Sequence, residues 1–304
     1  MAVDPGEGRE RIRVLVEVAA ANGSSISLTE LRELLPPGLF SSAEALARFL
    51  VADEGLAARF AMVAGEVTLR GHEALADHRR MQRGLAADRL AEADLFLERL
   101  GKVCPWIELA AISGSTAYDA AKPGDDLDFF LVTRRHRLWI TLLVALVRAR
   151  LERLRSPGAP VYCFNRLLER AACEHAFRER RDALFAREAL NLRVLRGGTL
   201  YRALLAGAPW MAEPFPGLYA ARAAGGDASA ARAPRGGTAG GILNGAALLF
   251  LGPYLWIAGV YRNAWLRRQG RVKECFRTVV RPDVCATESV LYDELREEYR
   301  RAFA

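Results

Sequence analysis

Hydrophobic positions at two different spacings predict the order of elements in the first seventy residues. Between residues 12 and 19, apolar side chains recur at the spacing of a helix. Ser27–Glu30 and Ser41–Glu44 each match a capping box, so a helix is predicted after each. Residues 60–69 alternate in the manner of a short hairpin. Three helices followed by a hairpin are typical of a winged helix, and we therefore predict a winged-helix-like module over residues 1–70.

Beyond this module the pattern predicts three further parts. Residues 71–104 combine spaced leucines with many charged side chains, as expected of a connecting helix. Residues 105–170 contain two apolar strand-like segments and form the predicted core. Residues 171–304 are predicted to be a helical C-terminal region, with a loop over the glycine- and proline-rich stretch 214–241. The fold class expected is α+β, with a mixed sheet in the core.

Composition and charge narrow the class of protein. The chain has 304 residues, of which 51% are hydrophobic and 26% charged, and this excludes a wholly disordered chain. The net charge is +7, but no dense basic run is present, so nucleic acid stays an open partner. The predicted recognition helix, residues 43–53, offers only Arg48 among acidic side chains. Sequence-specific DNA binding is therefore disfavoured relative to a packing or protein-interaction role.

The cysteines and the N-terminus favour a cytoplasmic location. The five cysteines are odd in number and scattered, with no C-x-x-C pair, so reduced thiols are expected rather than disulfides or a zinc site. The first residues contain no apolar segment of the kind found in a cleavable signal peptide.

Two aspartates at the start of a strand carry the strongest chemical signal. Asp126 and Asp128 are separated by one residue and followed by an apolar run. In a strand, such residues point to the same face, and two neighbouring carboxylates repel each other unless a cation neutralises them. Oxygen ligands of this kind suit Mg²⁺ or Mn²⁺, which share their sites with substrate phosphates. We therefore predict that Asp126 and Asp128 are catalytic and hold the metal. Asp125 is expected to point the other way.

A Gly-Ser turn lies ten residues before these aspartates. Gly114 would let the backbone approach a phosphate closely, and Ser115 would add a hydroxyl and the N–H groups of a helix start. A phosphate cradle opposite a metal-binding carboxylate pair suits an in-line attack on the α-phosphorus of a nucleoside triphosphate.

In these residues the chain resembles the DNA polymerase beta-like nucleotidyltransferase superfamily. That superfamily carries Gly-Ser, a spacer near ten residues and Asp-x-Asp with apolar flanks, and Gly114, Ser115, Asp126 and Asp128 fall on this pattern in order. The chain is more similar still to bacterial stand-alone nucleotidyltransferase-domain proteins, more loosely from Trp106 to Phe303. The resemblance implies transfer of a nucleoside monophosphate to an acceptor.

The resemblance also implies a third carboxylate from a later strand, and here the sequence departs from it. The available strand, residues 161–168, contains neither Asp nor Glu. Its alternation puts Asn165 on one face with Val161, Cys163 and Leu167, and Asn165 is the only metal-compatible side chain there. We expect Asn165 beside the aspartates and slow turnover, or a base from elsewhere, because an amide cannot accept the proton. Lys122, in the spacer loop, is a candidate for the triphosphate.

Residues 236–261 carry no charged side chain over a length that would span a bilayer. Arginines flank the stretch, but glycines and a central proline interrupt it, and the resemblance implies a buried helix of the C-terminal region. Burial is favoured, and membrane association through 236–261 is left open.

The sequence leaves two functions from different classes open. The first is a Mg²⁺-dependent nucleotidyltransferase that uses a nucleoside triphosphate and an unidentified acceptor, which is a protein, an RNA or a small molecule. The second is a catalytically weak or inactive relative that acts as a nucleotide-binding or regulatory module.

Overall fold

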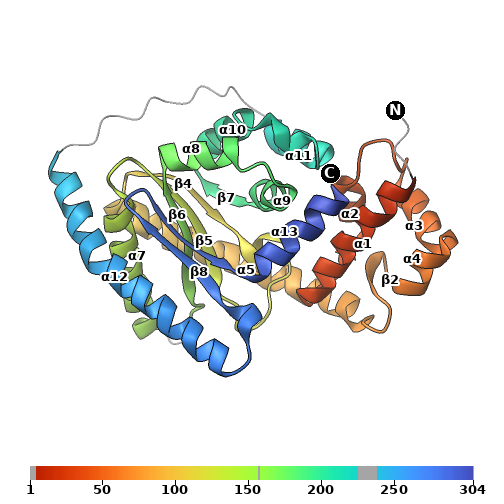
Figure 1. Cartoon of the computed structure of the whole chain (residues 1–304), viewed down its shortest axis with the longest axis horizontal. Coiled ribbons are helices and arrows are strands. Elements are labelled where there is room, and N and C mark those ends of the chain that lie inside the picture. The colour runs from red at the N-terminus through yellow and green to blue at the C-terminus, as the bar shows by residue number, and fades with distance from the viewer. Residues whose placement is uncertain (1–4, 157, 225–237, 304) are drawn as a thin grey trace.

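A six-stranded mixed sheet forms the centre of the α+β fold (Figure 1). The computed structural model describes residues 5–156, 158–224 and 238–303. The strand order is β7-β4-β5-β6-β9-β8, in which only β5 and β6 pair in parallel. The strands are β4 (Ile107–Ile112), β5 (Leu127–Thr133), β6 (Tyr162–Glu169), β7 (Arg193–Arg196), β8 (Phe276–Arg281) and β9 (Val284–Ser289).

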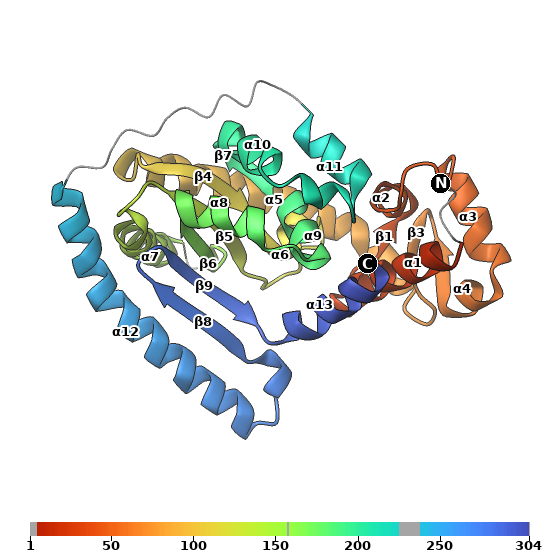
Figure 2. The same ribbon diagram turned by 45° about the horizontal axis from the view of Figure 1, so that its top comes forward.

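Helices cover both faces of this sheet, because the central strands are apolar on both sides. Phe129 and Leu131 of β5 point into one core, and Phe130 and Val132 into the other. The first core is closed by α5 (Ala74–Val103), α7 (Leu138–Arg155) and α12 (Thr238–Arg268), and the second by α8 (Arg170–Glu179), α9 (Ala183–Asn191) and α10 (Gly198–Ala206). Figure 2 shows the sheet between these two layers.

The first seventy residues form their own small sheet and helices at one end of the molecule (Figure 2). The predicted hairpin is present, and Ser27 and Glu30 form the predicted capping box. The third helix is capped by Ser42 rather than Ser41, and a short fourth helix precedes the hairpin. In chain order the elements are α1 (Pro5–Ala21), β1 (Ile26–Ser27), α2 (Leu28–Leu34), α3 (Ala43–Ala52), α4 (Glu54–Arg59), β2 (Phe60–Val63) and β3 (Glu66–Leu69).

The prediction of a purely helical region over 171–304 is wrong. Three strands of the central sheet, β7, β8 and β9, come from this part of the chain. Strands β8 and β9 form a hairpin at the edge of the sheet, where half of each strand is polar, and so no apolar run marks them. Helices α11 (Pro216–Ala223) and α13 (Leu291–Ala302) complete the region, with short turns at Pro209–Ala212 and Val272–Glu274.

The expected loop over 214–241 is also only partly present. Its first half contains the helix α11, which begins at Pro216, a favourable first position for a helix. Residues 225–237 lie outside the described residues, and α12 begins at Thr238.

The preference for a buried helix over 236–261 is wrong for the described residues. Only 22% of the most apolar window of α12 is buried, and its large side chains point outward. By length and composition, Gly241–Arg268 is the one helix of the described chain that is apolar and long enough to cross a membrane.

Candidate functional site

The predicted site residues gather where β5 begins and the one-turn helix α6 (Gly114–Ala117) follows β4. A cleft of about 1170 Å³ is lined by five of them, Gly114, Ser115, Lys122, Asp126 and Asp128. The sixth, Asn165, lines a smaller adjoining pocket of about 170 Å³ together with Gly114 and Asp128. Asp128 therefore lies between two cavities.

Gly114 is in direct contact with the Asp128 carboxylate. Its φ is +66°, and a Cβ at this position would lie 2.2 Å from Asp128 Oδ2. The backbone N–H of Ser113, one residue earlier, donates to the Asp128 carbonyl at 2.9 Å. The absence of a side chain at Gly114 thus makes room for the carboxylate. The sequence predicted glycine here for another reason, the close approach of a phosphate to the backbone.

Asn165 lies beside Asp128, as expected, but it presents its nitrogen to the carboxylate. Its Nδ2 donates to Asp128 Oδ1, while its Oδ1 accepts from the Cys163 thiol at 2.9 Å. Asn165 therefore holds the Asp128 carboxylate in place through its amide nitrogen, and it does not offer its amide oxygen to a metal ion at Asp128. The expected facing of Leu167 is wrong, because a bulge between Asp128 and Phe130 shifts the register and turns Leu167 into the opposite core.

The Asp128 carboxyl lies in an environment that disfavours its charge. Burial, and then the charges of the neighbouring Asp126, Asp125 and Glu188 carboxylates, raise its pKa to about 7. Burial beside the same charges raises the pKa of the Cys163 thiol to about 12, so this thiol stays protonated. The site is thus an acidic cluster that a cation would stabilise.

The Ser115 hydroxyl does not face open space as the Gly-Ser motif suggests. It donates to Asp125 Oδ2 at 2.8 Å, and the backbone N–H of Lys122 donates to the same oxygen at 3.0 Å. Asp125 therefore ties the spacer loop into a turn. The helix after the motif has four residues, too short for the expected helix-terminus dipole, so a phosphate here would rely on individual N–H groups.

Three residues outside the predicted site residues, Tyr118, Arg187 and Glu188, shape the same site. Glu188 of α9 lines both cavities, and its carboxylate accepts a hydrogen bond of 2.8 Å from the Tyr118 hydroxyl. Burial raises the pKa of Glu188, against the lowering effect of Tyr118. Beside them, Arg187 places its guanidinium over the Tyr118 ring, 5.2 Å from its centre.

Cationic side chains line the same larger cleft as the aspartates. Lys122 is one of them, and its ammonium forms no ion pair with any described residue; it packs close to Gly23. Arg187, Arg222 and Arg262 line the same cleft. A cleft with carboxylates at one place and cations at another suits a ligand that carries several negative charges and a metal ion.

Buried arginines of α5 position the loops that carry these groups. Arg79 is 4% exposed and donates to the carbonyls of Tyr118 and Asp119 at 3.0 and 2.9 Å. The same side chain donates to Glu30 of α2, at 3.0 Å, and so connects the N-terminal segment to the site. Arg89 donates to the Lys122 carbonyl at 2.7 Å.

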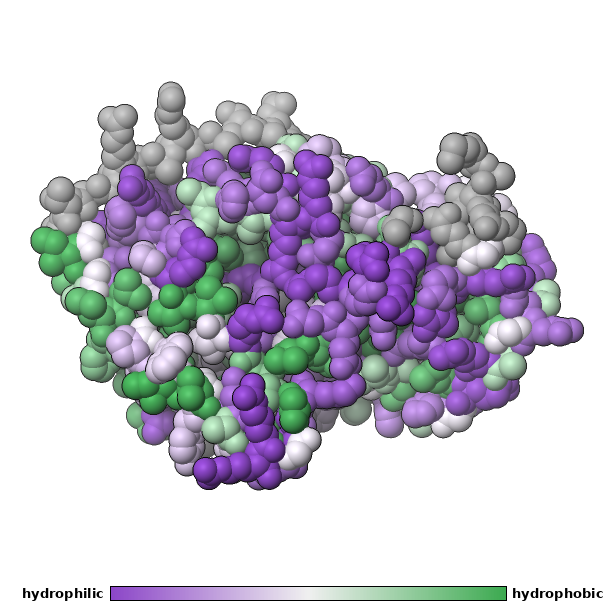
Figure 3. Space-filling view, in the orientation of Figure 1, coloured by the Kyte–Doolittle hydropathy of each residue, from purple (hydrophilic) through white to green (hydrophobic). Residues whose placement is uncertain are grey.

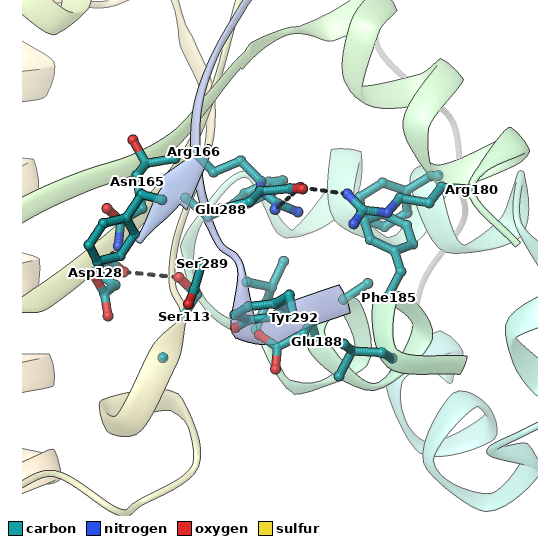
Figure 4. Close-up of a pocket in the computed structure, with 18 residues that line it drawn as sticks. Ser113, Asp128, Asn165, Arg166, Arg180, Phe185, Glu188, Glu288, Ser289 and Tyr292 are labelled. Carbon is teal, nitrogen blue, oxygen red and sulfur yellow. Dashed lines mark hydrogen bonds and ion pairs between the residues drawn. The ribbon is translucent and has the colours of Figure 1, made fainter. Parts of the chain in front are cut away.

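The smaller pocket has an apolar wall and a charged edge. Figure 4 shows Asp128 and Asn165 at one end and Arg180 and Phe185 at the other. Aromatic and aliphatic side chains make up much of the wall, and Glu288 accepts from both Arg166 and Arg180 at 2.8 Å. The apolar wall favours a ligand group without charge.

Neither protein-family models, nor curated proteins, nor solved structures gave a match to the chain.

Proposed function

We propose that the protein is a Mg²⁺-dependent nucleotidyltransferase that moves a nucleoside monophosphate from a nucleoside triphosphate to an acceptor hydroxyl. The observation that carries this proposal is the pair Asp126 and Asp128 at one cleft, with Asp128 packed against Gly114. The raised pKa of Asp128 supports it, because an acidic cluster of this kind is stabilised by a bound cation.

The residues present fit Mg²⁺ with two protein carboxylates. Mg²⁺ in triphosphate sites is usually bound by one or two carboxylates, with waters and substrate phosphates as the remaining ligands. Asp126 is exposed and Asp128 is half-buried, so both oxygens are within reach of the cleft. Among the described residues, no group of three His, Cys, Asp or Glu side chains is arranged to hold a metal ion. When bound, Mg²⁺ would supply charge neutralisation and polarisation of the α-phosphate.

The chain's own residues would bind and orient the triphosphate. Lys122 and Arg187 line the cleft near the aspartates and suit the β- and γ-phosphates. The cleft volume of about 1170 Å³ exceeds the range of about 300–1,000 Å³ common for a single small ligand. It therefore has room for a nucleotide and part of an acceptor.

In the proposed reaction, the acceptor oxygen forms a bond to the α-phosphorus and the bond to pyrophosphate breaks. The hydroxyl proton must go to a base, and Glu188 suits this role because it lines both cavities and its pKa is raised by burial. The apolar pocket next to Asp128 would then hold the uncharged body of the acceptor.

The N-terminal segment would serve as a wall of the cleft. Ser24 and Glu30 line it, and Arg79 holds both against the core loop. We propose that its winged-helix-like order supports packing here and not DNA reading.

The test is turnover with each radiolabelled nucleoside triphosphate and Mg²⁺, with and without cell extract as the source of acceptor. We expect pyrophosphate release with wild type and none with Asp126→Asn or Asp128→Asn. The control is Asp88→Asn, which changes an exposed carboxylate on α5 that does not line the cleft. Wild-type turnover in either site variant would contradict the proposal.

A second candidate function, nucleotide binding without turnover, is favoured by Asn165. Asn165 stands where the resembling superfamily has a carboxylate, and its oxygen faces Cys163. In that case Mg²⁺-dependent triphosphate binding would depend on Asp126 and Asp128, while no pyrophosphate would be released with any acceptor source.

A further inference from the structure

Helix α12 points most of its large apolar side chains away from the protein. Leu249, Phe250 and Tyr261 are 78%, 73% and 76% exposed, and Trp256 and Ile257 are each 58% exposed. Figure 3 shows hydrophobic side chains gathered on the part of the surface where Figure 1 draws α12. We call these five side chains the outer face of α12. A continuous apolar face of this kind marks an interaction surface.

The side of α12 that faces the protein carries small and polar residues together with two buried leucines, Leu251 and Leu266. A Cβ on Gly252 would lie 3.2 Å from Val280, and one on Gly259 would lie 2.7 Å from Thr278, both on β8. Asn244 is buried, and its side-chain oxygen accepts the backbone N–H of Trp139 at the start of α7. Asn263 exchanges two hydrogen bonds with the backbone of Phe276. Most of the large apolar side chains of α12 thus point outward, which is the arrangement expected of a helix that meets an apolar phase outside the protein.

The charges of α12 are all positive and lie at its C-terminal end. The helix has no acidic residue, and its only charged side chains are Arg262, Arg267 and Arg268. Arg267 and Arg268 are exposed and form no ion pair with any described residue. Trp256, Tyr261 and Trp265 lie along the same end. Tryptophan, tyrosine and arginine beside an apolar segment are the composition of chains that lie at a membrane surface.

We propose that the outer face of α12 docks the protein onto a bilayer that contains anionic lipids. The apolar side chains would enter the boundary of the acyl chains, and Arg267 and Arg268 would contact lipid phosphates. The helix lies in the membrane plane, because its inner face is packed on α7 and β8 along its length. This proposal does not depend on the proposed function.

The charge pattern favours lipid over a second copy of the chain. A symmetric dimer brings the same surface patch together twice. The α12 patch has arginines but no carboxylate to pair with them. Lipid phosphates supply the missing negative charge.

Binding of the full chain to vesicles, without nucleotide, tests the proposal. Vesicles of phosphatidylcholine alone are compared with vesicles of an equal mixture of phosphatidylcholine and phosphatidylglycerol, and bound protein is measured by flotation. We expect binding to the mixed vesicles, release by alkaline carbonate, and weak binding to phosphatidylcholine alone. Absence of binding to the mixed vesicles would overturn the proposal, and so would retention after carbonate, which indicates a spanning helix.

Two pairs of variants separate the apolar and the charged contributions. Leu249→Ser with Phe250→Ser should weaken binding roughly tenfold or more, since two large apolar side chains no longer leave water. Its control, Val51→Ser with Met81→Ser, removes apolar groups that are 65% and 56% exposed elsewhere and should bind as wild type does. All four positions are on the surface, so folding is expected to be preserved, as circular dichroism can verify.

The charged contribution is tested with Arg267→Gln and Arg268→Gln together. Each arginine near an anionic surface contributes about fivefold in affinity, so the double variant should bind about 25-fold more weakly to the mixed vesicles. The control is Arg80→Gln with Arg178→Gln, two exposed arginines on α5 and α8. The contradicting result is that wild type does not bind vesicles and forms a dimer in solution that the apolar and charged variants dissociate. The outer face of α12 would then bind a second copy of the chain, and the proposal fails.

Discussion

Gly114 and Asp128 approach each other so closely that neither position tolerates a larger group. We predict that Gly114→Ala abolishes Mg²⁺-dependent triphosphate binding, because the new Cβ would displace the Asp128 carboxylate. The positive φ adds a destabilisation of about 1 kcal/mol. Thermal unfolding and equilibrium binding of a fluorescent triphosphate measure the two effects.

Gly65 provides the matched control for that variant. It has φ +83°, and a Cβ there would meet nothing within 4 Å. Gly65→Ala should therefore lose similar stability and keep triphosphate binding. Equal binding loss in both variants would show that backbone strain alone, and not the contact with Asp128, is responsible.

Asp128 also gives the metal-free protein a particular dependence on pH. Its pKa of about 7 in the folded state lies above the usual value of 3.8, mainly through burial and then the Asp126 charge. The folded state therefore binds this proton more tightly than the unfolded state, so stability should fall as pH rises from about 4 to about 7. Above pH 7 this contribution should stay constant.

The comparison of wild type with Asp128→Asn isolates this effect from the other titrating groups. Denaturant unfolding in the presence of a chelator should show the variant gaining stability relative to wild type as pH rises over that window. Saturating Mg²⁺ should diminish the difference by stabilising wild type. A constant difference between the two proteins at all pH values would contradict the assigned environment of Asp128.

At the scale of the elements, α5 holds the N-terminal segment and the site loop together through Arg79. We predict that Arg79→Ala destabilises the protein by about 3 kcal/mol, because it leaves Glu30 without its buried partner and removes the donors to Tyr118 and Asp119. Chemical denaturation measures this loss. Arg80→Ala, on the exposed side of the same helix, should change stability by no more than about 0.5 kcal/mol.

Local patterns predicted the elements that depend on neighbouring residues. The hairpin of residues 60–69 and the capping box at Ser27 follow from short stretches of chain, and the structure has them. Asp126 and Asp128 line one cleft, with Asp126 just before the strand β5. Contacts between distant segments were not predictable in this way. Glu188 reaches the site from α9, and nothing in the residues around it marks a functional role.

Two elements were misjudged because burial depends on tertiary packing. Arg79 and Arg89 of α5 have the appearance of solvated charges, yet carbonyls of the site loop accept their hydrogen bonds. Conversely, α12 has the composition of a core helix, but most of its large apolar side chains are exposed, and it meets the protein through small and polar residues and a few leucines. Hydrophobicity alone does not tell whether an apolar side chain faces the core or a bilayer.

At the scale of the whole molecule, the proposed membrane-binding helix α12 and the proposed nucleotide and acceptor cavities share residues. Arg262 lies on α12 and also lines the large cleft, where its guanidinium is 4.8 Å from the centre of the Phe276 ring. Phe276 in turn lines the apolar pocket next to Asp128. A membrane bound at the outer face of α12 would therefore be near one edge of the proposed acceptor site.

The central claim is that Asp126 and Asp128 together bind a divalent cation with a triphosphate. The most direct measurement is Mn²⁺ binding by electron paramagnetic resonance, with and without a non-hydrolysable nucleoside triphosphate. We predict that wild type and Asp88→Asn bind Mn²⁺ more tightly when the triphosphate is present. Under the same conditions, the Mn²⁺ affinity of Asp126→Asn and of Asp128→Asn should be lower by about tenfold or more, as expected when a ligand bond is removed. Unchanged Mn²⁺ affinity in both site variants, with the fold intact, would contradict the account.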